Sequence, residues 1–260
     1  IHAERQSTPA RVLVERLLRS GSDDTRLQKA LSYLRGWDCR MDRDHVAPTI
    51  YSETRSQLIE RLVRHLFGSQ GERLLSGVVG ADAHVRLVSL EITLGIQRDD
   101  DSLLPDGETW DTILTTSLEQ ALDRLGASLG EDVDTWFWGR VHRTRPTHPL
   151  SATFPDVAEL LDPPSLGVHG DADTPLAGSY PLLSRYTVSG LSVNRYIHDP
   201  SDWRNSRWIV PLGSSGHPGS PHYADQAEMW ADVEFIPQLW DWGEIQEQAE
   251  TTQRLTPGGR

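Results

Sequence analysis

The chain has 260 residues, of which 37% are hydrophobic, 24% are charged and nine are tryptophan, a composition that excludes disorder throughout. Its 38 acidic and 25 basic side chains give a formal net charge of −13, which argues against a nucleic acid partner. No stretch approaches the roughly 18 uncharged apolar residues of a membrane helix, so no membrane partner is expected. The one cysteine, Cys39, excludes an internal disulfide and a zinc site built from several thiolates.

Apolar residues recur at helical spacing through much of the first half. The pattern covers residues 9–18 and 27–34, and Gly36 stops the second of these helices. It is longest over residues 47–67, where Pro48 occupies a first-turn position that helices permit. The apolar stripe of that long helix is formed by Tyr51, Thr54, Leu58, Leu62 and Leu66.

Another amphipathic helix is predicted over residues 109–125. Thr109 is a suitable N-cap, and Asp111 lies in the first turn, where its charge complements the helix dipole. Gly126 ends the pattern. The acidic run at residues 98–101, before this helix, is then a surface connection.

The pattern changes after Arg140. Five prolines fall between residues 146 and 164, and helical periodicity is lost. The sequence therefore predicts an α+β chain with a mainly helical segment, 1–140, and a strand and loop segment, 141–260. Stretches rich in β-branched and aromatic residues predict a small antiparallel set of strands at 186–188, 191–197 and 207–210.

Most standard catalytic motifs are absent from the sequence. It has no phosphate-binding loop, no dinucleotide-binding glycine fingerprint and no H-E-x-x-H, and residues 213–216 read G-S-S-G rather than G-x-S-x-G. Asp171 and Asp173 could together hold a hard cation, or they could bond the amides of a glycine-containing turn. Two carboxylates are too few for a cation site, so we favour the turn and predict no metal site in this chain.

Residues 213–223 form the most unusual segment, because three glycines and two prolines exclude a helix or a central strand. An acid/base pair of His217 and His222 is one interpretation. We favour a rigid structural loop whose glycines adopt conformations closed to other residues and whose His222 and Tyr223 anchor it by hydrogen bonds. The residues of this loop are Gly213, Gly216, His217, Gly219, Ser220, His222 and Tyr223.

The same loop, with Asp225, Gln226 and Trp230 after it, resembles the C-terminal signature of the penicillin acylase family. Members tend to read G-Q-S-G-x-P-x-S-P-H-Y-x-D-Q followed by a tryptophan, and here Ser214 replaces the glutamine. The resemblance spans nearly the whole chain. Other stretches similar to family segments are 1–11, 34–51, 170–174 and 194–211.

The family belongs to the N-terminal nucleophile hydrolases, so the resemblance implies an αββα four-layer fold and a serine, exposed by self-cleavage, that hydrolyses an amide. Because Ile1 carries no nucleophile, the chain is expected to be the C-terminal part of the catalytic β subunit, inactive alone. Its implied partners are the N-terminal part of that subunit, the α subunit and a small N-acyl substrate, such as a β-lactam or an acyl-homoserine lactone. The resemblance implies no cofactor in this chain, places the calcium ligands of those members that have them in the missing part, and favours a periplasmic or secreted location.

Some cephalosporin-directed members use a carboxylate from this part of the subunit to orient a histidine, and the resemblance points to Asp199 as its counterpart. The same Asp199 begins the sequence D-P-S-D, which is also a plain turn. Both interpretations stay open at this point.

A non-catalytic or truncated relative, serving as a binding or structural module, is the alternative to a piece of an enzyme. A serine-initiated companion polypeptide would favour the enzyme, and a lone folded chain would favour the module. Several tryptophans lie in segments with little local pattern and are expected on an apolar surface that meets the rest of the enzyme. They are Trp136, Trp138, Trp240 and Trp242.

Overall fold

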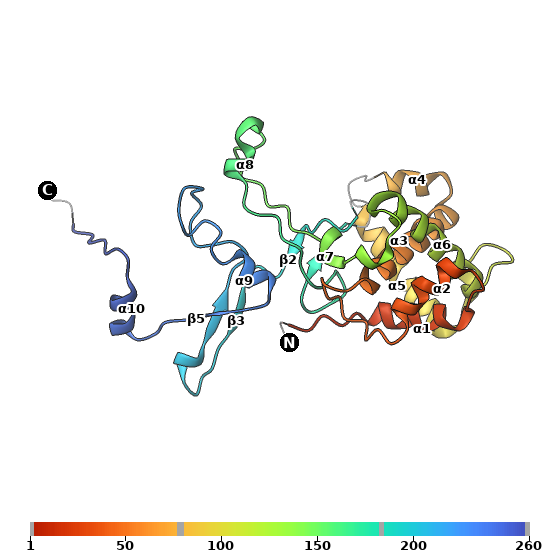
Figure 1. Ribbon diagram of the computed structural model, residues 1–260, viewed down its shortest axis with the longest axis horizontal. Coiled ribbons are helices and arrows are strands. Elements are labelled where there is room, and N and C mark those ends of the chain that lie inside the picture. The colour runs from red at the N-terminus through yellow and green to blue at the C-terminus, as the bar shows by residue number, and fades with distance from the viewer. Residues whose placement is uncertain (1–2, 77–80, 182–184, 258–260) are drawn as a thin grey trace. The chain divides into compact units, whose positions relative to one another are not determined.

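The computed structural model of the chain describes residues 3–76, 81–181 and 185–257. The chain divides into two compact units, Ile1–Ser192 and Val193–Arg260 (Figure 1). Long helices and small antiparallel sheets occur in the same chain, so the predicted α+β class is confirmed. The division of the chain into a mainly helical segment, 1–140, and a strand and loop segment, 141–260, stays a prediction.

The first unit is built mainly from helices, with α3 (Ala47–Phe67) at the centre. Within the described ranges, no helix is both long and apolar enough to cross a membrane. The longer helices that pack against α3 are α1 (Thr8–Ser20), α2 (Thr25–Leu34), α4 (Ser69–Leu75), α5 (Ala81–Arg98) and α6 (Trp110–Leu129).

The three helices predicted before residue 70 are confirmed. The bounds of α3 are those predicted, and Pro48 lies in its first turn. Ser7 caps α1 and Asp24 caps α2, each by accepting hydrogen bonds from amides of the first turn. Leu66, the last residue of the predicted apolar stripe, is 40% exposed, because the last turn of α3 lies outside the core.

The helix predicted from Thr109 is confirmed at its start and wrong at its end. Thr109 and Thr112 form a reciprocal cap, but α6 continues through Gly126 to Leu129 and is capped by Gly130 with φ 92°. The acidic run at residues 98–101, which we predicted as a surface connection, begins at the last residue of α5. The helix α5 itself was not predicted. The apolar side of α5 has helical spacing, at Val85, Val88, Ile92 and Ile96, and all four are buried.

An aromatic cluster completes the core of the first unit. Trp138 is fully buried, and its ring stacks on that of His142 with 4.4 Å between centroids. Tyr180 and Tyr186 meet the Trp138 ring edge-on. Trp136 is also buried, so the expectation that Trp136 and Trp138 lie on a surface is wrong. The two tyrosines that pack on Trp138 are more than forty residues away in the chain, a contact that local pattern does not show.

Backbone hydrogen bonds join three distant segments of the first unit. The Met41 amide donates to the Arg5 carbonyl, and the Gly170 amide donates to the Met41 carbonyl, both at 2.8 Å. The Leu176 amide donates to the Glu4 carbonyl at 2.7 Å. Gly170 has φ +86°, and a Cβ there would lie 2.0 Å from the Leu176 carbonyl oxygen, so this backbone junction requires glycine.

Short elements make up the rest of the first unit. The strand predicted at 186–188 is wrong, because Arg185 (φ 34°) and Tyr186 (φ 64°) have left-handed backbones and only Val188 forms a bridge, to Thr144. β1 and β2 pair antiparallel. The remaining elements are α7 (Trp138–Val141), α8 (Ala158–Leu161), β1 (Gly178–Ser179), β2 (Gly190–Leu191) and the 3₁₀ helices Asp101–Leu103, Val133–Thr135 and Pro155–Val157.

The second unit contains a three-stranded antiparallel sheet in the order β3-β4-β5. Two of its strands lie within the predicted stretches 191–197 and 207–210 and pair antiparallel, as predicted. The stretch 191–197 is not one strand, however, because residues 192–194 have no strand structure between β2 and β3. The elements of this unit are β3 (Arg195–Ile197), the 3₁₀ helix Trp203–Asn205, β4 (Arg207–Ile209), α9 (Ala227–Ala231), β5 (Ile236–Pro237) and α10 (Trp242–Gln248).

Candidate functional site

Asp199 lies in the connection between β3 and β4, where its carboxylate organises the turn. One oxygen accepts hydrogen bonds from the Ser201 amide at 2.9 Å and the Ser201 hydroxyl at 2.5 Å. The other accepts from the Asn205 side-chain amide at 3.0 Å. The Ser201 hydroxyl and the Asn205 amide hold the pKa of this carboxyl at about 2, so it is ionised at neutral pH. Both oxygens thus bond groups of the turn, as the plain-turn interpretation requires.

The loop at 213–223 closes on itself by backbone hydrogen bonds. The Gln226 amide donates to the Leu212 carbonyl at 2.9 Å, and the Ser215 amide donates to the His222 carbonyl at 3.0 Å. A Cβ on Gly213 would lie 2.1 Å from that same His222 oxygen, so the close approach requires glycine. This approach fixes the base of the loop.

The expectation of left-handed glycines in this loop is wrong. Gly213, Gly216 and Gly219 all lie outside the positive-φ region, and a Cβ on Gly216 would meet open space. Sequence composition indicated the loop but not which glycine is constrained, because the constraint at Gly213 comes from the backbone of His222, on the opposite side of the loop.

Side chains of the loop also bond locally. The His217 Nδ1 accepts from the Gly219 amide at 3.0 Å, and the Ser220 hydroxyl accepts from the His222 amide at 3.1 Å. The Tyr223 amide donates to the Ser220 carbonyl at 3.2 Å. The assignment of these residues to a structural role, with His222 and Tyr223 as anchors, stays a prediction.

His222 lies between two carboxylates. Among the candidate residues predicted from the sequence, it is the one histidine that contacts carboxylates within the described ranges. Its Nδ1 lies 2.8 Å from Asp225 Oδ2, and its Nε2 lies 3.2 Å from Glu250 Oε2. Hydrogen bonds to Asp225 and then Glu250 raise the pKa of this imidazole. Because both ring nitrogens face carboxylates, the geometry is that of an ion-pair link and not of a base aimed at a serine hydroxyl.

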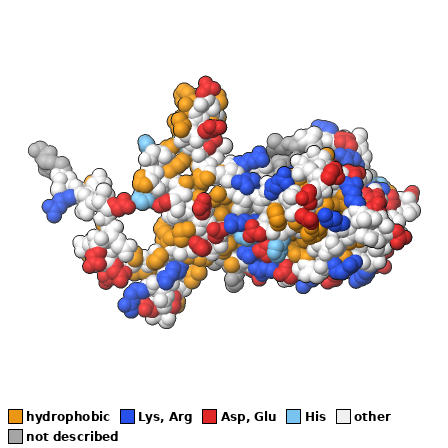
Figure 2. All heavy atoms as spheres, in the orientation of Figure 1, with side chains coloured by type: hydrophobic (Ala, Val, Ile, Leu, Met, Phe, Trp, Pro, Cys, Tyr) orange, Lys and Arg blue, Asp and Glu red, His pale blue; other side chains and the backbone are white. Residues whose placement is uncertain are grey.

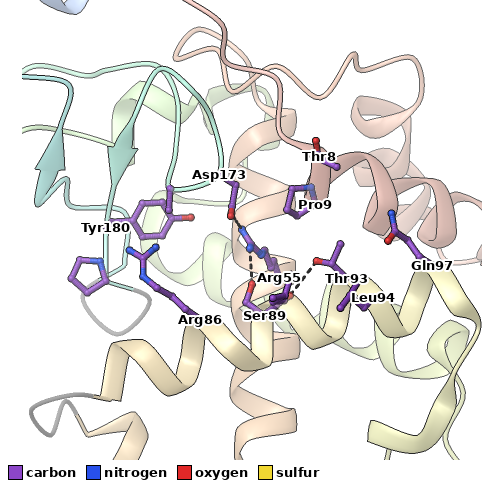
Figure 3. A pocket seen from close by; sticks show the side chains of 13 residues that line it. Thr8, Pro9, Arg55, Arg86, Ser89, Thr93, Leu94, Gln97, Asp173 and Tyr180 are labelled. Carbon is purple, nitrogen blue, oxygen red and sulfur yellow. Dashed lines mark hydrogen bonds and ion pairs between the residues drawn. The ribbon is translucent and has the colours of Figure 1, made fainter. Parts of the chain in front are cut away.

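A cavity of about 370 Å³ lies between α5 and the start of α1 in the first unit (Figure 3). Arg55 of α3 projects into it, donating to Asp173 Oδ2 and to the Ser89 hydroxyl, each at 2.6 Å. Apolar side chains line much of the remaining wall, including Leu90 and Leu94. The cavity is amphipathic, and the partly buried guanidinium of Arg55 is already paired.

Asp171 lies beside this cavity and is 1% exposed. Its Oδ1 accepts from the Asp173 amide at 2.7 Å, as the turn interpretation predicts, while its Oδ2 is buried without a hydrogen-bond partner. Burial raises the pKa of this carboxyl to about 6. No cluster of three or more metal-ligating side chains occurs in the part of the chain that the structure describes.

Sequence reasoning missed a charged cluster on α3. Arg185 forms ion pairs with both Glu53 and Glu60, which lie two turns apart on that helix. Glu53 is buried, and burial raises the pKa of its carboxyl against the opposing effect of Arg185. The acidic residues have the seven-residue spacing of one helix face, but their partner is more than a hundred positions away in the chain.

Comparison with known proteins identifies the class. The model of the penicillin amidase family matches residues 1–247, and the chain belongs to that family. The recognition of the family from the 213–223 loop is thereby confirmed.

Particular relatives carry acylase names. The chain is 35% identical to the penicillin acylase 2 proenzyme of Pseudomonas sp. strain SE83, over 99% of this chain and 32% of that protein. It is 28% identical to the acyl-homoserine lactone acylase QuiP of Pseudomonas putida, over 53% of this chain and 16% of that protein. The chain thus spans about a third or less of the length of these two relatives.

A solved structure is also similar. The thermostable penicillin G acylase from Alcaligenes faecalis matches with a TM-score of 0.49 and 15% sequence identity, over 99% of this chain and 48% of that one.

Proposed function

We propose that this chain is the C-terminal part of an amide hydrolase that removes the acyl group from an N-acylated small molecule. The observation that carries the proposal is the match of the penicillin amidase family over residues 1–247. The substrate class, a β-lactam or an acyl-homoserine lactone, follows from the names of the relatives. The serine nucleophile belongs to the remaining part of the enzyme.

The geometry of the candidate residues supports a structural contribution by this part. The loop at 213–223 bonds mainly to itself, and Asp199 is engaged by its own turn. Orientation of a histidine by Asp199 remains a proposal, which would require a further bond to one of its oxygens in the assembled enzyme. The chain therefore supplies packing and support to a reaction centre formed elsewhere.

The test compares the chain alone with the chain combined with the remaining part of its own acylase. Release of the primary amine is measured with penicillin G and with N-acyl-homoserine lactones of different acyl lengths. Turnover is expected only in the combined sample. Turnover by the chain alone, abolished by a substitution within residues 1–260, would show that the nucleophile lies here, and an inert combined sample would favour the non-catalytic module.

A further inference from the structure

One face of the β3-β4-β5 sheet carries aromatic side chains. Tyr196 of β3 lies opposite Trp208 of β4, and Trp208 lies opposite Ile236 of β5, so these three side chains share a face. On the other face, the buried Arg195 places its guanidinium 4.3 Å from the centre of the Trp230 ring on α9, whereas Ile197 at the end of β3 is 45% exposed. The aromatic side chains thus lie on the face of the sheet opposite the Arg195–Trp230 contact.

The aromatic face continues past the end of the strands as a row of five rings in contact. His198 stacks on Tyr196 with 5.4 Å between centroids, and Trp203 meets His198 at 6.4 Å. Trp240 then packs on Trp203 at 4.9 Å. We call these side chains the aromatic row: Trp208, Tyr196, His198, Trp203 and Trp240.

The outer end of the aromatic row is open to solvent. Trp203 is 49% exposed and Trp240 is 45% exposed, and hydrophobic atoms are visible at the surface of the second unit (Figure 2). Burying such rings is strongly favourable, since each aromatic side chain removes about 150–250 Å² from water. Exposed tryptophans in contact with one another are typical of a surface that another protein covers.

Charged side chains surround this end of the row. Asp199 and Asp202 lie in the turn that carries Trp203, and Asp202 pairs with Arg204 at 3.0 Å. Asp241 follows Trp240 directly. An aromatic centre with a charged rim is the usual anatomy of a protein interface, and the acidic excess at the rim disfavours an anionic lipid surface.

We propose that the aromatic row is the surface on which the remaining polypeptide of the acylase docks, and this inference rests on the proposed function. The chain corresponds to 32% of the proenzyme that it matches over 99% of its own length, so most of that protein lies outside the matched region. The three strands of the second unit are two or three residues long, and the row beside them ends in two tryptophans that are each about half exposed. The rest of the larger protein thus packs against the aromatic row.

The experiment measures binding of the chain to the remaining part of its own acylase, produced as a separate polypeptide. The variant Trp203→Gln/Trp240→Gln removes the exposed end of the row, and Trp242→Gln removes a tryptophan that is 69% exposed in the same unit but outside the row. We expect the double variant to bind at least tenfold more weakly and the control to bind within about threefold of the native chain. Acrylamide quenching of tryptophan fluorescence should fall on binding, and less so for the double variant.

Circular dichroism and thermal melting of each variant alone check that the fold is retained, which is expected because both replaced side chains are half exposed. If the double variant disturbs the fold, Trp240→Gln alone is used, with an expected loss of at least threefold. Equal binding of the native chain and the folded row variant would overturn the inference, as would no binding at all. So would a dimer of the chain, formed through the row, that the remaining polypeptide cannot displace. A complex that forms through the row but hydrolyses no amide would contradict the proposed function, while the row would still be supported as the docking surface.

Discussion

Replacement of Asp171 by asparagine tests the electrostatics of the turn beside the Arg55 cavity. The carboxyl is 1% exposed, its Oδ2 has no hydrogen-bond partner, and burial raises its pKa from the ordinary 3.8 to about 6. Asp173 raises the pKa further, while Arg55 opposes both effects. Between these two pH values the folded chain holds a proton that the unfolded chain has lost.

The sign and size of the effect follow from this proton. The stabilisation is complete well below pH 3.8, where both states are protonated, and is lost as pH rises through about 6. Because each tenfold change in proton affinity is about 1.4 kcal/mol, the whole shift is worth about 3 kcal/mol, of which about 1 kcal/mol is already lost at about pH 4.5. An asparagine side chain cannot ionise, so the free energy of unfolding of Asp171→Asn relative to the native chain should rise by about 2 kcal/mol between about pH 4.5 and pH 7.5.

Urea denaturation of both chains at several pH values in this range measures that difference, and groups common to both chains cancel. Asp199→Asn is the matched control: its pKa of about 2 places its titration below the range, so it should leave the pH dependence unchanged. A pH dependence of unfolding that is the same in Asp171→Asn and the native chain would refute the argument from burial.

Three further predictions concern the second unit. Gly213→Ala should lower the free energy of unfolding by about 2 kcal/mol or more, because its Cβ would lie 2.1 Å from the His222 carbonyl oxygen. Gly216→Ala should change it by less than about 0.5 kcal/mol, since its Cβ would meet open space, and equal effects of the two variants in chemical denaturation would contradict the loop geometry. The His222 ring proton should titrate in NMR with a pKa above 6.5 that falls in Asp225→Asn, and a midpoint at or below 6.5 in the native chain would show that the carboxylates do not pair with it. In the assembled enzyme, Asp199→Asn should leave KM nearly unchanged and reduce kcat by a large factor if Asp199 orients a histidine, whereas a rate within twofold of native would assign it to its turn alone.

The sequence predicts those parts of the fold that depend on neighbours along the chain. The α3 bounds are correct because a first-turn proline and a long apolar stripe act locally. The α6 start is correct because Thr109 is a cap residue. By contrast, residues 186–188 have strand propensity, yet Arg185 is held by two carboxylates of α3, and the backbone beside it is left-handed. An ion pair between distant segments overrides propensity there.

The candidate site divides in the same way. Composition is enough to indicate that 213–223 is an ordered loop, and its residues do bond to one another. Composition cannot say that Gly213 and not Gly216 is constrained, because the neighbouring atom belongs to His222. Likewise, Trp138 and Trp240 look alike in sequence, but only Trp138 finds ring partners that bury it fully.

The junction of Arg5, Met41 and Gly170 also bears on how the chain is made. Helices form within about a microsecond, so α1 to α3 can form as soon as they leave the ribosome. The carbonyls of Glu4 and Met41, however, cannot accept their hydrogen bonds from the amides of Leu176 and Gly170 until those two residues have been synthesised. At a synthesis rate of about 5–20 residues per second, that delay is on the order of ten seconds or more. In a ribosome-bound chain that ends after α6, residues 3–5 should therefore be cut more readily by proteases than in the finished chain, and their full protection should come once Leu176 has emerged.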